Sequence, residues 1–301
     1  MPAQHHSPSL VRGLGLFATI AIVVGDVIGT GVFLKARVMT CDVGTPGLAL
    51  AAWTVAGLLS LAGALTYGEL AAMMPEAGGE YVYLRNGYGR LWGFLFGWSR
   101  FFIGSTGGNA ALAAGLAIFL NVVLGGALSG HQTVLYLFDT AWPLGAVQGV
   151  AIAAIVVATA INCASVSMGG AVASVFTILK IGLVLGVGVA ILALGAGDWS
   201  HFATSGAGGT CDGVTDAARG GMAGFGAAML AALWAYNGWN EVTYVGGEVR
   251  DPQRNLPIAL IAGIGIIGAL YLFVNTAYYY VLTPMEIANM SATSSERIAL
   301  T

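Results

Sequence analysis

Apolar residues along this chain form long continuous runs, and short segments between the runs hold most of the charged residues. A run of about 20 apolar residues is the length that an α-helix needs to cross ~30 Å of hydrocarbon. The pattern predicts seven membrane-spanning helices, at residues 13–34, 47–74, 91–124, 146–166, 171–195, 221–247 and 256–282.

The prolines agree with these boundaries. Pro46, Pro143 and Pro257 stand at the starts of predicted spans, where a missing N–H group costs least. Pro75 and Pro284 lie just past the ends of other spans. Because no proline lies inside a predicted span, any interruption of a helix must come from other residues.

The composition places the chain in lipid. Hydrophobic residues make up 57% of the 301 positions, and charged residues make up only 8%. A soluble domain carries roughly a quarter charged residues, so we expect one transmembrane domain surrounded by the bilayer. The net charge of −3, with 11 Lys and Arg residues, argues against nucleic acid as a partner. The three cysteines form no CxxC motif and the four histidines lie outside the spans, so we expect no metal, cofactor or catalytic centre.

The first span, "AIVVGDVIGTGVFLK", contains three glycines beside an acid and a threonine. Glycine inside a helix costs about 1 kcal/mol relative to alanine, so this stretch is a place where the helix can open. Gly25 and Gly29 also form a GxxxG pattern, which would let two membrane helices pack closely. The additional Gly31, with Asp26 and Thr30 nearby, favours a broken helix over packing alone.

The sixth span, "LWAYNGWNEVTYVGGE", places Asn237, Gly238 and Asn240 among aromatic residues. Polar asparagine at membrane depth is costly unless it faces protein or water. Opened backbone is tolerated there only where it lines a cavity, and it exposes N–H donors and C=O acceptors. An amino acid zwitterion needs both, and the positive end of a half-helix favours its carboxylate. Two interrupted spans in equivalent positions of two repeats indicate a transporter site.

At these residues the chain resembles the amino acid–polyamine–organocation superfamily, most closely its L-type amino acid transporters and their bacterial relatives. The resemblance rests on "GDVIGTGVF", "SLAGALTYGELAAMMPEAGGEYVYLRNGYG" and "WAYNGWNEVTYVGGEVRDPQRNLP", and it extends from Leu14 to Arg297. It implies an all-α transmembrane fold of five plus five helices in inverted repeats, with helices 1 and 6 broken. The chain would supply helices 1–5 over about 13–195, helices 6–7 over about 221–282, and the start of an outer loop at 283–301. We therefore expect an incomplete domain, truncated after helix 7.

The resemblance also implies an activity. It indicates a secondary active transporter that moves amino acids by alternating access, independently of sodium, either by exchange or by proton coupling. It places the protein in the cell membrane with its N-terminus in the cytoplasm. A channel, a non-transporting membrane protein and an inactive transporter fragment remain as alternatives. A membrane-embedded enzyme is disfavoured, because no span holds a metal cluster or paired carboxylates.

The resemblance assigns roles residue by residue. The substrate-binding positions that it implies are Ile28, Gly29, Thr30, Gly31, Trp234, Ala235 and Asn237. Glycine and threonine N–H groups of the first break would hold the substrate carboxylate, and carbonyls of the second would hold its ammonium. Trp234 would be the aromatic outer gate. The coupling positions are Gly25, Asp26 and Lys180.

Lys180 lies in the middle of the fifth span, where an ammonium costs ~2.5–3.5 kcal/mol or more. About eight residues separate it from either end, roughly 12 Å of helix, which is too far for the side chain to reach water. In sodium-independent members of the superfamily a lysine of helix 5 takes the place of a sodium ion and touches helix 1 near its break. We predict that Asp26 and Lys180 approach each other in one state of the cycle.

Three further expectations concern the loops and helix 3. Cys41 and Cys211 fall on the outer side, where they either form a disulfide or remain free thiols. Some relatives pair with a glycoprotein through an outer cysteine, but these two cysteines establish no partner subunit. The segment "GSTGGNAALAAG" suits close packing of helix 3 against helix 1. The inner loop is expected to hold a charge cluster, formed by Glu241, Glu248, Arg250 and Arg254.

Overall fold

The computed structural model describes residues 10–130, 133–137, 140–164, 166–205, 209–211 and 219–289. Its first elements are α1 (Leu16–Val27), α2 (Gly31–Val43), α3 (Pro46–Met73), α4 (Glu80–Tyr88), α5 (Arg90–Ser99), the π-helical turn η1 (Arg100–Ser105) and α6 (Thr106–Val123). The later elements are β1 (Thr133–Leu137), β2 (Thr140–Leu144), α7 (Ala146–Ala164), α8 (Val166–Leu194), the 3₁₀ helix η2 (Trp199–Ala203), α9 (Gly221–Ala235), the 3₁₀ segment η4 (Trp239–Glu248), α10 (Pro252–Val281) and α11 (Pro284–Asn289).

Most of the predicted spans correspond to helices of membrane-crossing length. Five helical stretches in the described part of the chain are long and apolar enough: α3, residues 90–123, α7, residues 168–194 of α8, and α10. The first predicted span, residues 13–34, contains α1 and the start of α2, which meet at an angle of 52°, and α2 continues beyond the predicted end to Val43. The sixth is divided in the same region of the fold, because α9 has only 15 residues and continues into η4. Both interruptions occur in the spans where the sequence predicted them.

The described chain is not entirely helical, because the connection between α6 and α7 forms a β-hairpin. Strands β1 and β2 are antiparallel, with Thr133 opposite Leu144 and Leu137 opposite Thr140. The expectation of an all-α chain therefore holds for the membrane spans but not for this connection.

The start of α10 differs from the prediction. Helix α10 begins at Pro252, so Pro257 lies inside the helix and not at its start. Pro252 fills the first helical turn, where its missing N–H group is tolerated. Pro257 packs on α3, since a Cβ atom added to Gly68 would lie 3.3 Å from the Pro257 Cα. The prediction that no proline lies inside a span was therefore wrong.

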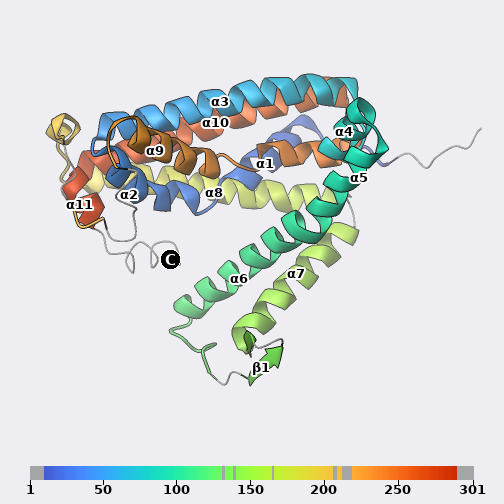
Figure 1. The fold of residues 1–301 in the computed structure, drawn as a ribbon, viewed down its shortest axis with the longest axis horizontal. Coiled ribbons are helices and arrows are strands. Elements are labelled where there is room, and N and C mark those ends of the chain that lie inside the picture. Colours follow the sequence, from blue (N-terminus) through green and yellow to red (C-terminus); the bar gives the residue numbers. More distant parts are fainter. Residues whose placement is uncertain are drawn as a thin grey trace, which may run out of the picture.

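Helix α10 lies at the centre of the main bundle and packs along α3, α1 and α8 (Figure 1). Its buried face includes Tyr271, which meets Trp53 of α3 and Tyr236 at the end of α9. The three rings lie with centroids 5.1–6.0 Å apart, in the edge-on and tilted arrangements that aromatic pairs prefer. This cluster fixes α10 against α3 and against the end of α9.

Helices α6 and α7 form a hairpin that leaves the main bundle at an angle (Figure 1). A Cβ atom added to Gly107, Gly108 or Gly115 would meet no other residue within 4 Å. The expected close packing of this glycine-rich segment against the first span is therefore absent from the structure. Small residues permit helices to approach, but without a hydrophobic force in lipid they do not by themselves bring helices together.

The ends of the main bundle near α4 are joined by backbone and charged contacts. The Leu14 N–H donates to the Glu248 carbonyl at 3.0 Å, and the Arg250 N–H donates to the Leu14 carbonyl at 2.8 Å. Glu241 forms an ion pair with Arg100 of η1. The expected cluster of Glu241 with the arginines of the following loop is therefore wrong as to partner, because η1 brings Arg100 closer than the loop does.

Candidate functional site

The first helix break spans residues 28–30, between α1 and α2. Ile28 ends α1 with an extended ψ of 104°, and its N–H group donates to the Val24 carbonyl at 3.0 Å. Gly29 and Thr30 are exposed, whereas Ile28 is buried. The first N–H groups of α2 have no partner within their helix and form its positive end. Gly29 and Thr30 leave the break accessible, whereas Gly31 and Val32 at the start of α2 are buried.

The second break follows Ala235, the last residue of α9. Gly238 has a φ of 113°, a left-handed conformation that side-chain-bearing residues rarely adopt, and this turn redirects the chain into η4. The Asn237 N–H donates to the Trp234 carbonyl at 3.2 Å. The side chains of Trp234 and Asn237 are exposed.

The structure brings the two breaks into contact. A Cβ atom added to Gly238 would lie 3.2 Å from the Asp26 carbonyl oxygen. One added to Gly31 would lie 3.0 Å from the Ala235 Cβ and 3.1 Å from the Trp234 ring. Neither glycine leaves room for a side chain without a shift of its neighbours, so the two breaks lie in direct contact.

Tyr271 of α10 connects the two breaks, and sequence reasoning did not identify it. Its hydroxyl lies 3.1 Å from the Val27 carbonyl oxygen and 3.0 Å from the Ala235 carbonyl oxygen. These are the last carbonyls of α1 and α9, and the one hydroxyl proton is shared between them. Tyr271 is fully buried. A tyrosine in a long apolar run carries no pattern that distinguishes it from other packed aromatic residues.

Helix α8 supplies two further partners to the carbonyls of α1. The Lys180 ammonium donates to the Gly25 carbonyl at 2.8 Å, and the Thr177 hydroxyl donates to the Ala21 carbonyl at 2.7 Å. A Cβ atom at Gly25 would lie 2.3 Å from the Thr177 Oγ1, so α1 and α8 can approach this closely only with glycine there. Gly25 is therefore both a packing residue and an acceptor.

Asp26 is exposed beside the first break, and no ion pair within 4.0 Å joins it to Lys180 in the described part of the chain. The Lys180 ammonium contacts the backbone one residue earlier, at Gly25. Their approach in another state of the cycle stays a prediction.

Trp239, which follows the second break, packs on Tyr67 of α3, with ring centroids 5.1 Å apart. It therefore belongs to the packed core around the site.

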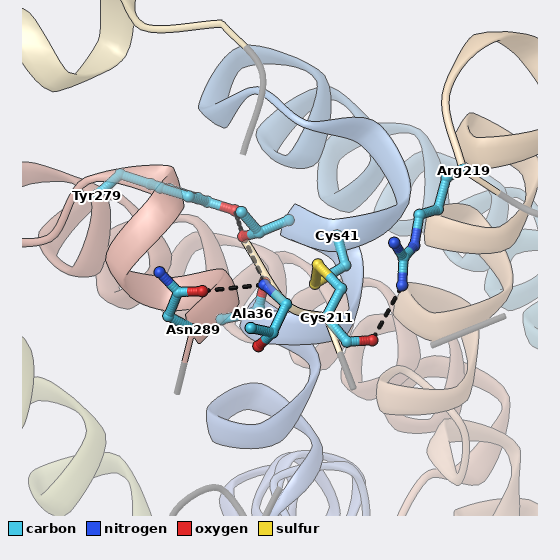
Figure 2. Close-up of a disulfide and its surroundings, with 8 residues drawn as sticks. Ala36, Cys41, Cys211, Arg219, Tyr279 and Asn289 are labelled. Atoms are coloured by element: carbon cyan, nitrogen blue, oxygen red, sulfur yellow. Dashed lines mark hydrogen bonds between the residues drawn. A yellow bond between two sulfur atoms is a disulfide. The ribbon is translucent and has the colours of Figure 1, made fainter. Parts of the chain in front are cut away.

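A disulfide joins Cys41 of α2 to Cys211, ahead of α9 (Figure 2). Nearby, the Thr40 hydroxyl hydrogen-bonds to the Tyr279 hydroxyl of α10 at 2.7 Å, and Arg219 donates to the Cys211 carbonyl at 3.0 Å. The disulfide, which the sequence left open, thus ties α2, the second half of the first broken span, to the segment that leads into α9.

Other candidate centres lie apart from the breaks. A cavity of about 620 Å³ between α3, α4 and α5 is lined by aromatic and apolar side chains, with Glu80 and Asn86, and by none of the predicted site residues. Within the ranges that the structure describes, no three His, Cys, Asp or Glu residues gather closely enough to hold a metal ion.

Comparison with known proteins identifies a family and several relatives of this chain. A family described as "Amino acid permease" matches residues 14–297. The chain is 32% identical over 288 residues to the b(0,+)-type amino acid transporter 1 of Mus musculus, covering 94% of this chain and 54% of that protein. It is 32% identical over 290 residues to the serine/threonine exchanger SteT of Bacillus subtilis, covering 96% and 60%. It is 31% identical over 288 residues to the large neutral amino acids transporter small subunit 2 of Oryctolagus cuniculus, covering 94% and 50%. The chain spans about half the length of the curated relatives that it matches.

Proposed function

Because the chain belongs to the amino acid permease family, a family of membrane transporters and not of enzymes, we propose that it carries the amino acid site of a secondary active transporter. The observation that carries this proposal is the contact between the two helix breaks. Gly31 at the start of α2 lies against Ala235 at the end of α9. A zwitterion bound there would meet N–H donors at one side and carbonyl acceptors at the other.

We assign the substrate carboxylate to the break at Ile28, Gly29, Thr30 and Gly31, and the ammonium to the carbonyls near Trp234, Ala235 and Asn237. Helix geometry supports the first assignment, because the amino end of α2 is positive. The Trp234 carbonyl already accepts from the backbone N–H groups of Tyr236 and Asn237, whereas the Ala235 carbonyl accepts from the Tyr271 hydroxyl. A carbonyl oxygen has two lone pairs, so the Ala235 carbonyl can still accept from an ammonium.

Transport is proposed to be independent of sodium, with Lys180 in the role of a bound cation. The contact that supports this is the 2.8 Å hydrogen bond from the Lys180 ammonium to the Gly25 carbonyl, near the end of α1. The ammonium would neutralise the negative end of that half-helix, as a metal cation would. Gly25 and Asp26 complete the coupling region. Exchange of amino acids and proton coupling are both compatible with this arrangement.

In the cell membrane, with the N-terminus proposed to be cytoplasmic, the Cys41–Cys211 disulfide would face the oxidising side. Helices 1–5 of the first repeat would be α1 to α8, and α9 and α10 would begin the second. One relative is named a small subunit. A partner of this chain could not use Cys41 or Cys211 as a linking thiol, because these two residues are bonded to each other.

The test is uptake of labelled amino acids into liposomes that contain the purified protein. Both the 301-residue chain and any longer gene product that contains it should be measured. Saturable uptake in sodium-free buffer is expected; faster uptake with internal amino acid would identify exchange, and faster uptake with a proton gradient would identify symport. Non-saturating conductance would instead identify a channel. Absence of both from folded protein would leave a non-transporting membrane protein or an inactive fragment.

A further inference from the structure

Lys35 of α2 lies against the aromatic residue at the end of α9. Its ammonium nitrogen is 4.4 Å from the centroid of the Trp234 ring. Trp234 is 57% exposed, and its ring also lies against Gly31, the first residue of α2. Lys35 follows Gly31 by four residues, so it lies on the same face of the helix and roughly 6 Å further out. A charged group therefore stands about one helical turn from the first break, at the open side of the proposed site.

The charge of Lys35 is not cancelled by a neighbour in the described part of the chain. No carboxylate lies within 4.0 Å of it, and the two ion pairs of the described residues involve other groups, near α4 and η4. An indole face attracts a cation through its quadrupole but carries no net charge. The acids Asp212 and Asp216 lie outside the described residues.

The charged groups that face the breaks from each side give this region a net positive charge. Lys35 stands on the outer side, and the Lys180 ammonium stands on the inner side at Gly25. Among the described residues, Asp26 lies beside the first break, and Glu241, whose charge acts on Asp26, is paired with Arg100. The charges of an amino acid's own carboxylate and ammonium cancel. The charge of the ligand's side chain therefore decides whether the net positive charge of this region attracts or repels the ligand.

We propose that Lys35 is a specificity-determining residue: it makes the site select amino acids with neutral side chains and exclude those with cationic side chains. This inference rests on the proposed function. A lysine or arginine ligand would bring a second cation close to Lys35 beside Trp234, where like charges repel. A neutral side chain is not repelled by Lys35, and it can pack on the Trp234 indole that Lys35 holds in place.

The experiment is competition for binding and for uptake, with labelled threonine as the probe and unlabelled neutral amino acids, lysine and arginine as competitors. Four variants are compared with wild type: Lys35→Arg, Lys35→Gln, Lys35→Glu, and Arg254→Gln as a charge control on the exposed start of α10. The preference measured is the ratio of the affinity for neutral amino acids to the affinity for lysine and arginine. In a partly hydrated site, removal of one unit charge changes this ratio by about threefold, and reversal of the charge changes it by about tenfold. We therefore expect about threefold loss of preference in Lys35→Gln, about tenfold in Lys35→Glu, and none in Lys35→Arg or Arg254→Gln.

The outcomes separate this inference from the function on which it rests. An unchanged preference in Lys35→Glu, in protein that still binds threonine, would overturn the role of Lys35 and leave the amino acid site standing. An equal loss of affinity for all competitors in Lys35→Gln and Lys35→Glu would also overturn it, because that pattern indicates only a loosened Trp234. Absence of amino acid binding in the wild type would overturn both proposals.

Discussion

Replacing Tyr271 with phenylalanine tests how the two helix breaks are held together. The change removes one hydroxyl group and keeps the ring that packs on Trp53 and Tyr236. The Val27 and Ala235 carbonyls would lose a donor that lies 3.1 and 3.0 Å away. Leaving buried acceptors without a partner costs about 1–3 kcal/mol. Since 1.4 kcal/mol is a factor of ten, local opening at both breaks should become about tenfold more frequent.

Hydrogen exchange followed by mass spectrometry measures this opening without requiring transport. Peptides covering residues 26–31 and 234–239 should exchange about tenfold faster in Tyr271→Phe, and both should respond together because one hydroxyl serves both carbonyls. Tyr280→Phe is the matched control. It lies in the same helix, and its ring packs on Trp199 with centroids 4.8 Å apart, away from the breaks. Exchange within twofold of wild type at both breaks in Tyr271→Phe, or acceleration at only one of them, would refute the reasoning.

Three further predictions concern packing, the Cys41–Cys211 disulfide and pH. Gly25→Ala should lower the stability of the detergent-solubilised protein by about 1–3 kcal/mol, because the new methyl group would lie 2.3 Å from the Thr177 hydroxyl oxygen of α8. Gly115→Ala is the control: its methyl group would meet nothing within 4 Å, so a thermal melt of this variant should show no loss of stability. Reduction of the disulfide, whose cysteines are 170 residues apart, should lower the unfolding free energy by about 2–5 kcal/mol; a melt of Cys163→Ser protein with and without reductant measures this. Hydrogen bonds from the Thr283 backbone N–H and hydroxyl hold the pKa of Glu286 below its usual value of 4.5. These hydrogen bonds therefore stabilise α11 fully above pH 4.5, and the stabilisation is lost as the pH falls through the lowered pKa of Glu286. Amide exchange in residues 283–288, corrected for intrinsic rates, should show this loss in wild type and not in Glu286→Gln; equal pH profiles would contradict it.

The breaks were predictable because they follow from local properties of the chain. Glycine is a poor helix former, and the run from Gly25 to Gly31 concentrates that weakness within one span. The structure divides the helix there, between Val27 and Gly31. Gly238 was likewise marked by its asparagine and aromatic neighbours, and the left-handed backbone at this position explains why the sequence has glycine.

Contacts between distant elements were less predictable. The role of Tyr271 depends on where α10 lies relative to both breaks, which no local pattern specifies. The same reason explains why Arg100, and not a nearby loop arginine, pairs with Glu241. Pro257 was misplaced because proline marks a helix start only statistically, and α10 begins a turn earlier at Pro252.

Uptake of a labelled amino acid into sodium-free proteoliposomes, compared between wild type and Lys180→Met, tests the central claim most directly. Methionine keeps much of the length of the side chain and removes the ammonium that binds the Gly25 carbonyl. Arg254→Gln serves as the control for loss of a charge elsewhere. The account predicts saturable uptake without sodium in wild type and in the control, and none above background in folded Lys180→Met protein. Uptake that requires sodium in wild type, or equal uptake by Lys180→Met, would contradict it.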